Sequence, residues 1–99
     1  MGKVRAICVS EKRGVGKTKV EEAVFCRDFG IMGDAHAGKW PRQVTLLSKE
    51  AMDAYKKAGA EVSEGDFGEN LVVEGFNFKE LAVGTLLRCG DVLLEISQI

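Results

Sequence analysis

Glycine turns divide this chain into short apolar segments, and no other feature constrains its fold as strongly. The 99 residues include 12 glycines and a single proline. Short stretches rich in apolar and β-branched residues, bounded by glycine turns, are typical of β-strands. Six such strands are predicted, over residues 3–10, 20–27, 42–47, 69–74, 85–89 and 92–97.

Only one segment, residues 48–58, predicts a helix. Ser48 can cap its N-terminus, Met52 and Tyr55 recur at helical spacing, and Gly59 suits the position after its last turn. We expect the Met52 and Tyr55 side chains to pack in the core. One helix provides too few crossovers for a parallel sheet, so the predicted fold is mainly β, an antiparallel barrel or sandwich forming one domain.

Composition and charge exclude several function classes. Hydrophobic residues make up 45% and charged residues 29%, as in an ordinary globular protein. No apolar run is long enough for a membrane span and the first residues do not predict a secretory signal, so we expect a cytoplasmic protein without a membrane partner. Residues 1–50 carry a net charge of +4 and residues 51–99 one of −5. This favours at most a small anionic ligand and does not predict nucleic-acid binding.

The three cysteines predict neither disulfides nor a metal centre. Cys8, Cys26 and Cys89 are odd in number and widely spaced, and each lies in an apolar, strand-like context. We expect buried free thiols at all three positions. With a single histidine and no closely spaced cysteine pair, the chain lacks the usual ligands of a zinc site.

Residues 29–40 form the first candidate site. This glycine-rich stretch holds the only histidine, His36, and the only tryptophan, Trp40. Asp34 and His36 are two residues apart, so in an extended loop Asp34 could hold one tautomer of the imidazole. An equally good interpretation is a tight turn whose Asp and His cap its own amides. No serine or cysteine in the loop could act as a nucleophile.

Two other motifs are less specific. Glu69 and Asn70 place a carboxylate and an amide at a turn-to-strand edge, where Asn70 by itself is best explained as satisfying turn amides. Residues 14–18 resemble part of a phosphate-binding loop, but the first glycine of that motif is replaced by Glu11 and no helix follows. A polar hairpin loop explains these residues.

Taken in order, several segments resemble a MOSC domain, the domain named for the C-terminal part of molybdenum cofactor sulfurases. The most specific are the Gly-Asp-x-His loop at 33–36 and the Gly-Glu-Asn-Leu segment at 68–71. The others are residues 11–12, 20–23, 28–31, 42–47 and 83–90.

The resemblance implies a PK-barrel-like β fold and a role in molybdenum cofactor chemistry. That role is binding of the molybdopterin cofactor or transfer of sulfur to a metal–sulfur centre. Small stand-alone bacterial members are linked to detoxification of N-hydroxylated base analogues. Longer relatives are fused to a pyridoxal-phosphate cysteine desulfurase, which nothing in this sequence resembles, so no pyridoxal phosphate site is expected.

One departure from the family pattern bears on activity. The family's functional cysteine follows the strand that corresponds to residues 92–98, in a segment beyond Ile99, whereas Cys89 lies upstream of it. We therefore expect an incomplete barrel, the N-terminal portion of the domain, with impaired sulfur transfer and no catalytic residue. Whether the chain is an enzyme stays open.

The resemblance and the residues together predict a site for a small anionic cofactor. Its ligand-facing residues are expected to be Asp34, His36, Lys39, Arg42, Glu69 and Asn70. Among them, Lys39 and Arg42 would neutralise the cofactor phosphate. The alternative is a non-catalytic binding or assembly protein, because an unclosed barrel exposes strand edges that favour a homo-oligomer or a complementing chain. A third is an inert fragment.

Overall fold

A computed structural model describes residues 2–13, 16–40 and 42–97, and its architecture is mainly β, as predicted. The described residues form eight short strands, one α-helix and one 3-10 turn. In chain order these are β1 (Lys3–Val9), β2 (Thr18–Val20), β3 (Phe25–Cys26), β4 (Gly30–Ile31), β5 (Leu46–Ser48), α1 (Lys49–Lys57), β6 (Leu71–Glu74), η1 (Phe78–Glu80), β7 (Leu86–Cys89) and β8 (Val92–Glu95).

A four-stranded sheet with the order β2-β1-β6-β5 forms the centre of the molecule. β1 runs antiparallel to both of its neighbours, while β5 and β6 are parallel. The parallel pair departs from the antiparallel expectation, because α1 and the loop after it return the chain to the same end of the sheet. Such a crossover is what two parallel neighbours require.

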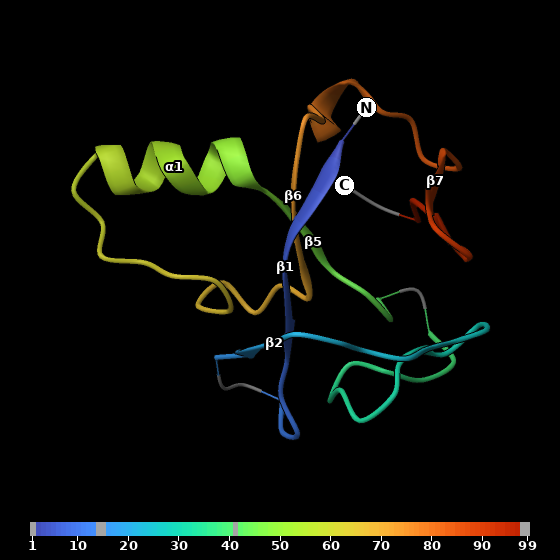
Figure 1. Cartoon of the computed structure of the whole chain (residues 1–99). Coiled ribbons are helices and arrows are strands. Elements are labelled where there is room, and N and C mark those ends of the chain that lie inside the picture. Colours follow the sequence, from blue (N-terminus) through green and yellow to red (C-terminus); the bar gives the residue numbers. More distant parts are fainter. Residues whose placement is uncertain (1, 14–15, 41, 98–99) are drawn as a thin grey trace.

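Two small hairpins accompany the sheet without closing it into a barrel. β3 pairs with β4, and β7 pairs with β8 across the predicted Gly90-Asp91 link. In Figure 1, α1 and the β7–β8 hairpin lie on opposite sides of the strands β1 and β6. The described strands therefore form an incomplete barrel-like fold, in agreement with the expectation.

The helix has the ends that the sequence predicts. The Ser48 hydroxyl accepts a hydrogen bond from the Ala51 amide at 3.1 Å, and Gly59 takes a φ of +104° after the last turn. Met52 is fully buried against the sheet, as expected. Tyr55 is 54% exposed, so its core assignment was wrong; its ring instead lies against Phe67, with centroids 5.4 Å apart.

All six predicted strands are shorter in the structure, and two of them differ most from the expectation. The segment predicted as one strand over 20–27 is divided, because the chain leaves β1 after Val20 and its next strand, β3, pairs with β4. The segment predicted over 42–47 contributes only β5, from Leu46 to Ser48.

The cysteines differ in environment. All three are free, but only Cys8 is buried, while Cys26 is half-buried and Cys89 is exposed. Burial for Cys89 was a wrong prediction, because this side chain lines an open cavity between the β7–β8 hairpin and the main sheet and does not pack in the core. Burial, followed by the charges of Glu69 and Glu64, raises the pKa of the Cys8 thiol to about 11, so this thiol is protonated at neutral pH.

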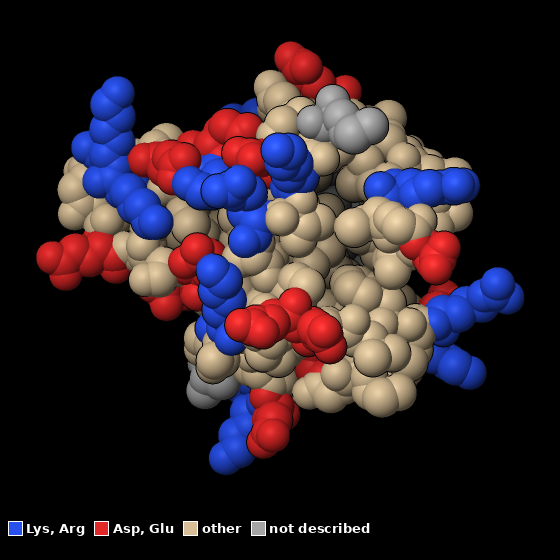
Figure 2. Space-filling model, in the orientation of Figure 1, with Lys and Arg blue, Asp and Glu red and all other residues tan. Residues whose placement is uncertain are grey.

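Surface charges of both signs are interspersed. On the face shown in Figure 2, basic and acidic side chains alternate without forming a large single-sign patch. This agrees with a solvated surface of mixed charge. Within the described ranges, none of the helices has both the length and the apolar character needed to cross a bilayer.

Candidate functional site

A buried ion pair ties the start of β2 to the loop after β4. The Lys17 Nζ lies 2.7 Å from the Asp34 Oδ1, and both side chains are completely shielded from solvent. Lys17 directly precedes β2, and Asp34 follows β4 by three residues. Two segments that carry no regular strand pairing to each other are thus joined through one side-chain contact.

Both oxygens of the Asp34 carboxylate accept hydrogen bonds. Its Oδ1 also accepts from the Ser10 amide at 3.1 Å, and its Oδ2 accepts from the His36 amide at 3.1 Å. Burial by itself would raise the pKa of this carboxyl, but the hydrogen bonds, that from Lys17 foremost, outweigh it and lower the pKa. Asp34 is therefore ionised and acts as an acceptor that organises the loop.

Lys17, and not Asp34, holds the His36 ring. The Lys17 Nζ is 3.0 Å from the His36 Nδ1, whereas the nearest Asp34 oxygen is 4.0 Å from that nitrogen. An ammonium group can only donate, so Nδ1 accepts and the ring proton lies on Nε2. The expectation that Asp34 fixes the tautomer is corrected here, while the capping of backbone amides by Asp34 is confirmed.

Trp40 and Arg13 cover the histidine. The Trp40 indole N–H donates to the His36 carbonyl at 2.6 Å, and the two rings are nearly parallel, with centroids 6.1 Å apart. The Arg13 guanidinium lies 4.7 Å from the Trp40 ring centroid, and its Nε donates to the Ala35 carbonyl at 3.3 Å. A cation over an indole face is a favourable contact. The 33–40 loop is therefore packed against the segment that follows β1.

Trp40 also belongs to a cavity of about 970 Å³. Lys39, Trp40 and Arg42 line one part of it, residues 43–46 lead from there into β5, and residues 93–97 of β8 and its extension form another part. Its remaining lining residues are Asp28, Phe78 and Leu87. Two exposed cations and an aromatic ring thus adjoin a wall of aliphatic and polar side chains, and the carboxylates of Asp28 and Glu95 line the same cavity.

Glu69 and Asn70 are buried beneath the turns and make contacts to backbone groups. The Glu69 carboxylate accepts from the Gly65 amide at 2.8 Å and from the Phe67 amide at 3.2 Å. The Asn70 side chain accepts from the Thr45 amide and donates to the Cys8 carbonyl, both at 3.0 Å. Glu69 stabilises its own turn, and Asn70 joins β1 to the segment before β5.

The six predicted site residues thus occupy three neighbouring places. Asp34 and His36 share the cluster with Lys17, whereas Lys39 and Arg42 line the cavity. Glu69 and Asn70 are buried at the second glycine turn, and the Asn70 side chain contributes to the lowered pKa of Asp34. The two glycine turns are therefore adjacent, as the site hypothesis requires.

Lys17 is the residue that sequence reasoning missed. It stands in a charged loop where no apolar period marks it as buried, and its partner is 17 positions away. The fold also shows why the second turn has a glycine beside Lys17. Gly65 has a φ of +94°, its carbonyl accepts from the Lys17 amide at 2.9 Å, and a Cβ there would lie 1.9 Å from the Lys17 carbonyl oxygen. Only glycine allows this approach of the two backbones.

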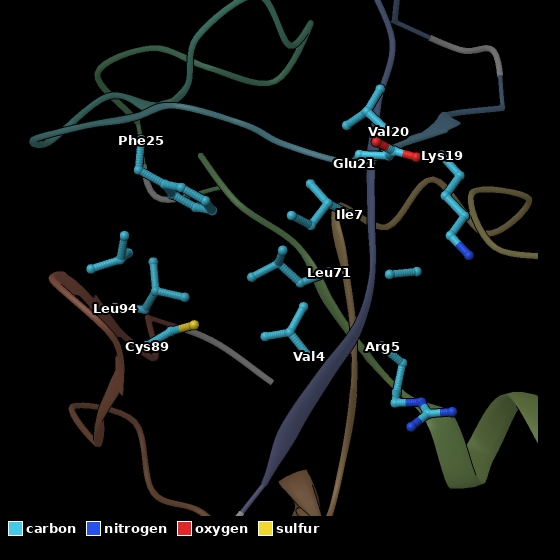
Figure 3. A pocket seen from close by; sticks show the side chains of 12 residues that line it. Val4, Arg5, Ile7, Lys19, Val20, Glu21, Phe25, Leu71, Cys89 and Leu94 are labelled. Carbon is cyan, nitrogen blue, oxygen red and sulfur yellow. The ribbon is translucent and has the colours of Figure 1, made fainter.

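A second cavity, of about 730 Å³, lies between the main sheet and the β7–β8 hairpin. Figure 3 shows Val4, Leu71, Leu94 and Cys89 on one side of β1, with Arg5 and Lys19 on the other. This cavity is mainly apolar, and Arg5, Lys19 and Glu21 supply the charged side chains of its lining. Within the described residues, no three His, Cys, Asp or Glu side chains are placed to hold a metal ion.

Comparison with known proteins identifies the family. The model of the MOSC domain matches residues 33–99, so the chain belongs to the MOSC domain family. A protein named "Reductase" from Gibberella moniliformis is 29% identical over 91 residues, an alignment that covers 83% of this chain and 16% of the relative. The chain therefore spans a small part of that relative's length. No solved structure matches the chain.

Asn70→Ala is expected to destabilise the domain by about 2–4 kcal/mol, because it leaves a buried carbonyl and an amide without partners. The measurement is the free energy of unfolding in urea. Asn77→Ala is the matched control, since Asn77 is exposed and, among the contacts described, its side chain bonds only the Lys79 amide. Equal losses in the two variants would contradict the assigned role of Asn70.

Proposed function

We propose that this domain binds the molybdenum cofactor, with the phosphate-bearing pterin in the 970 Å³ cavity. One observation carries the proposal: Lys39, Trp40 and Arg42 line the same cavity. Lys39 and Arg42 would bind the phosphate, and the Trp40 ring offers a flat surface to the pterin. Membership of the MOSC family supports the identity of the ligand.

The cavity suits the organic part of this cofactor. Its volume lies at the upper end of the range of about 300–1,000 Å³ that is usual for small-molecule sites. Hydrogen bonds from cationic side chains to phosphate are among the strongest in proteins. Leu46, Leu93 and Leu94 supply an apolar wall that can exclude water from the ring system. When bound, the cofactor supplies a molybdenum–sulfur centre for redox or sulfur chemistry.

The residues described favour binding over sulfur transfer. A sulfur carrier requires a reactive thiolate. Cys8 is buried, with the pKa of its thiol raised to about 11, and Cys89 lines the other cavity. None of the described residues lining the 970 Å³ cavity is a cysteine. For the described residues around this cavity, we propose that they bind the anion, place Trp40 and hold the loop through Lys17 and Asp34.

Removing the two cations tests the proposal. The Lys39→Ala, Arg42→Ala double variant is expected to bind molybdopterin at least about tenfold more weakly, because two charge-assisted hydrogen bonds are lost. Binding is measured by equilibrium dialysis, with pterin fluorescence as the readout.

The matched control removes the same charge elsewhere. The Lys56→Ala, Lys57→Ala variant alters two exposed lysines in the last turn of α1 and is expected to bind like the wild type. Equal affinity in all three proteins would remove Lys39 and Arg42 from the site. An equal loss in both variants would indicate only a long-range effect of net charge.

A second candidate function is assembly through strand addition. β5 ends the main sheet, and β8 pairs with β7 alone among the described strands. Residues 43–46 and 93–97, at these two strands, line the same 970 Å³ cavity. A strand from a second copy of the chain could pair with one of these edges, since an open edge presents unpaired backbone groups.

Assembly predicts an oligomer that a charge at β8 disrupts. The wild type is expected to show a concentration-dependent increase in mass in sedimentation equilibrium, and Leu93→Lys is expected to abolish it. Leu86→Lys is the matched control, because Leu86 is similarly exposed on the same hairpin but lines neither cavity. A wild type that stays monomeric at every concentration, or identical behaviour of the two variants, would contradict this candidate.

A further inference from the structure

The only imidazole of the chain is held by a contact that depends on its protonation state. His36 Nδ1 lies 3.0 Å from the Lys17 Nζ, and the lysine side chain is fully buried. The imidazole is 29% exposed, so a proton from solvent can reach the ring. Lys17 is itself fixed by Asp34 at 2.7 Å.

Protonation of Nδ1 would turn this attraction into repulsion. The lone pair that accepts from Lys17 would carry a hydrogen, and two donors with two positive charges would face each other. Asp34 cannot take over as partner without rearrangement, because its nearest oxygen lies 4.0 Å from Nδ1, beyond hydrogen-bond distance. The imidazole or the Lys17 ammonium group must therefore move when the ring becomes charged.

We propose that His36 is a pH-sensitive switch for the 33–40 loop. In one state Nδ1 accepts a hydrogen bond from Lys17, and in the other Nδ1 is protonated and this hydrogen bond is broken. The proposal rests on the proposed function for its ligand and adds a mode of regulation to that site. Ring movement is transmitted to Trp40, which lies parallel to the imidazole and lines the cavity beside Lys39.

Taken together, burial and the charged groups around the His36 imidazole favour its neutral form. Burial lowers the pKa of His36 most, the positive charges of Lys17 and Arg13 lower it further, and Asp34 opposes them. The folded protein thus binds a proton at His36 less readily than the unfolded chain, whose pKa is near 6.5. The contribution of His36 to the free energy of unfolding is therefore fully present above pH 6.5. It decreases as the pH falls below 6.5, until His36 is charged in the folded state too.

Anion binding and protonation should be coupled in this arrangement. An imidazolium adds positive charge beside Trp40, which lines the cavity, so an anion in the cavity is expected to bind more tightly below the pKa of His36. By reciprocity, the bound anion must raise that pKa. The molybdopterin-binding test of the Lys39→Ala, Arg42→Ala variant does not depend on this coupling.

The switch can be tested in the wild-type protein, because the chain has one histidine and one tryptophan. Nitrogen NMR shifts of the imidazole are followed from pH 8 to 4. We expect Nδ1 without a proton and Nε2 with one at the upper end, and a midpoint below 6.5. An Nδ1–H tautomer, or a midpoint at or above 6.5, would overturn the proposal.

Trp40 fluorescence supplies the second readout. The wild type is expected to show a fluorescence change with the same midpoint as the NMR titration, and His36→Gln is expected to lose it. A change that persists in His36→Gln, or no change in the wild type, would overturn transmission from His36 to Trp40.

Inorganic phosphate, used as the anionic probe, separates the switch from the ligand site. Phosphate is expected to raise the NMR midpoint in the wild type and to leave it unchanged in the Lys39→Ala, Arg42→Ala variant. An equal response in both proteins, or no response in the wild type, would overturn the coupling. Weak molybdopterin binding together with an intact NMR titration would count against the proposed function and not against the switch.

Discussion

The buried ion pair of Lys17 and Asp34 is the contact on which the rest of the site depends. Two charges without solvent access are costly, and their attraction offsets that cost only when every remaining hydrogen-bonding group is satisfied. Here the carboxylate accepts from Lys17 and from the amides of Ser10 and His36. Among the described residues, no buried side-chain nitrogen or oxygen lacks a partner. The cluster meets the condition for a stable buried pair.

This pair also explains how an incomplete barrel can have an ordered loop at its mouth. The 33–40 loop has little regular pairing, so its position depends on side chains. Lys17 reaches Asp34 with its ammonium group and bonds Gly65 with its backbone amide, and in this way it joins both glycine turns. Trp40 and the cavity beside it follow from the same arrangement.

Local signals in the sequence predicted local structure well. Ser48 and Gly59 marked both ends of the helix, and the Gly90-Asp91 link marked the β7–β8 hairpin, because capping and turn chemistry act over a few residues. The family and the mainly β fold were also predicted correctly. The division of the 20–27 strand was not predictable, since it depends on which distant strand lies beside each half.

The candidate site was predicted only in part for the same reason. Asp34, His36, Lys39 and Arg42 lie close together in sequence and could be found in one loop. Lys17 resembles any surface lysine in a charged loop, and only the fold reveals its burial. Glu69 and Asn70 were singled out at a turn-to-strand edge. Glu69 bonds amides of its own turn, whereas the bonds of the Asn70 side chain depend on the approach of β1 and the segment before β5.

A double-mutant cycle on the ion pair tests the account most directly. Unfolding free energies are measured for the wild type, Lys17→Met, Asp34→Asn and the double variant. Each single change should cost about 3–5 kcal/mol, because it leaves one charge buried without its partner. The double variant should lose much less than the sum of the two. Additive losses, with a coupling energy below about 0.5 kcal/mol, would contradict the central role of this pair.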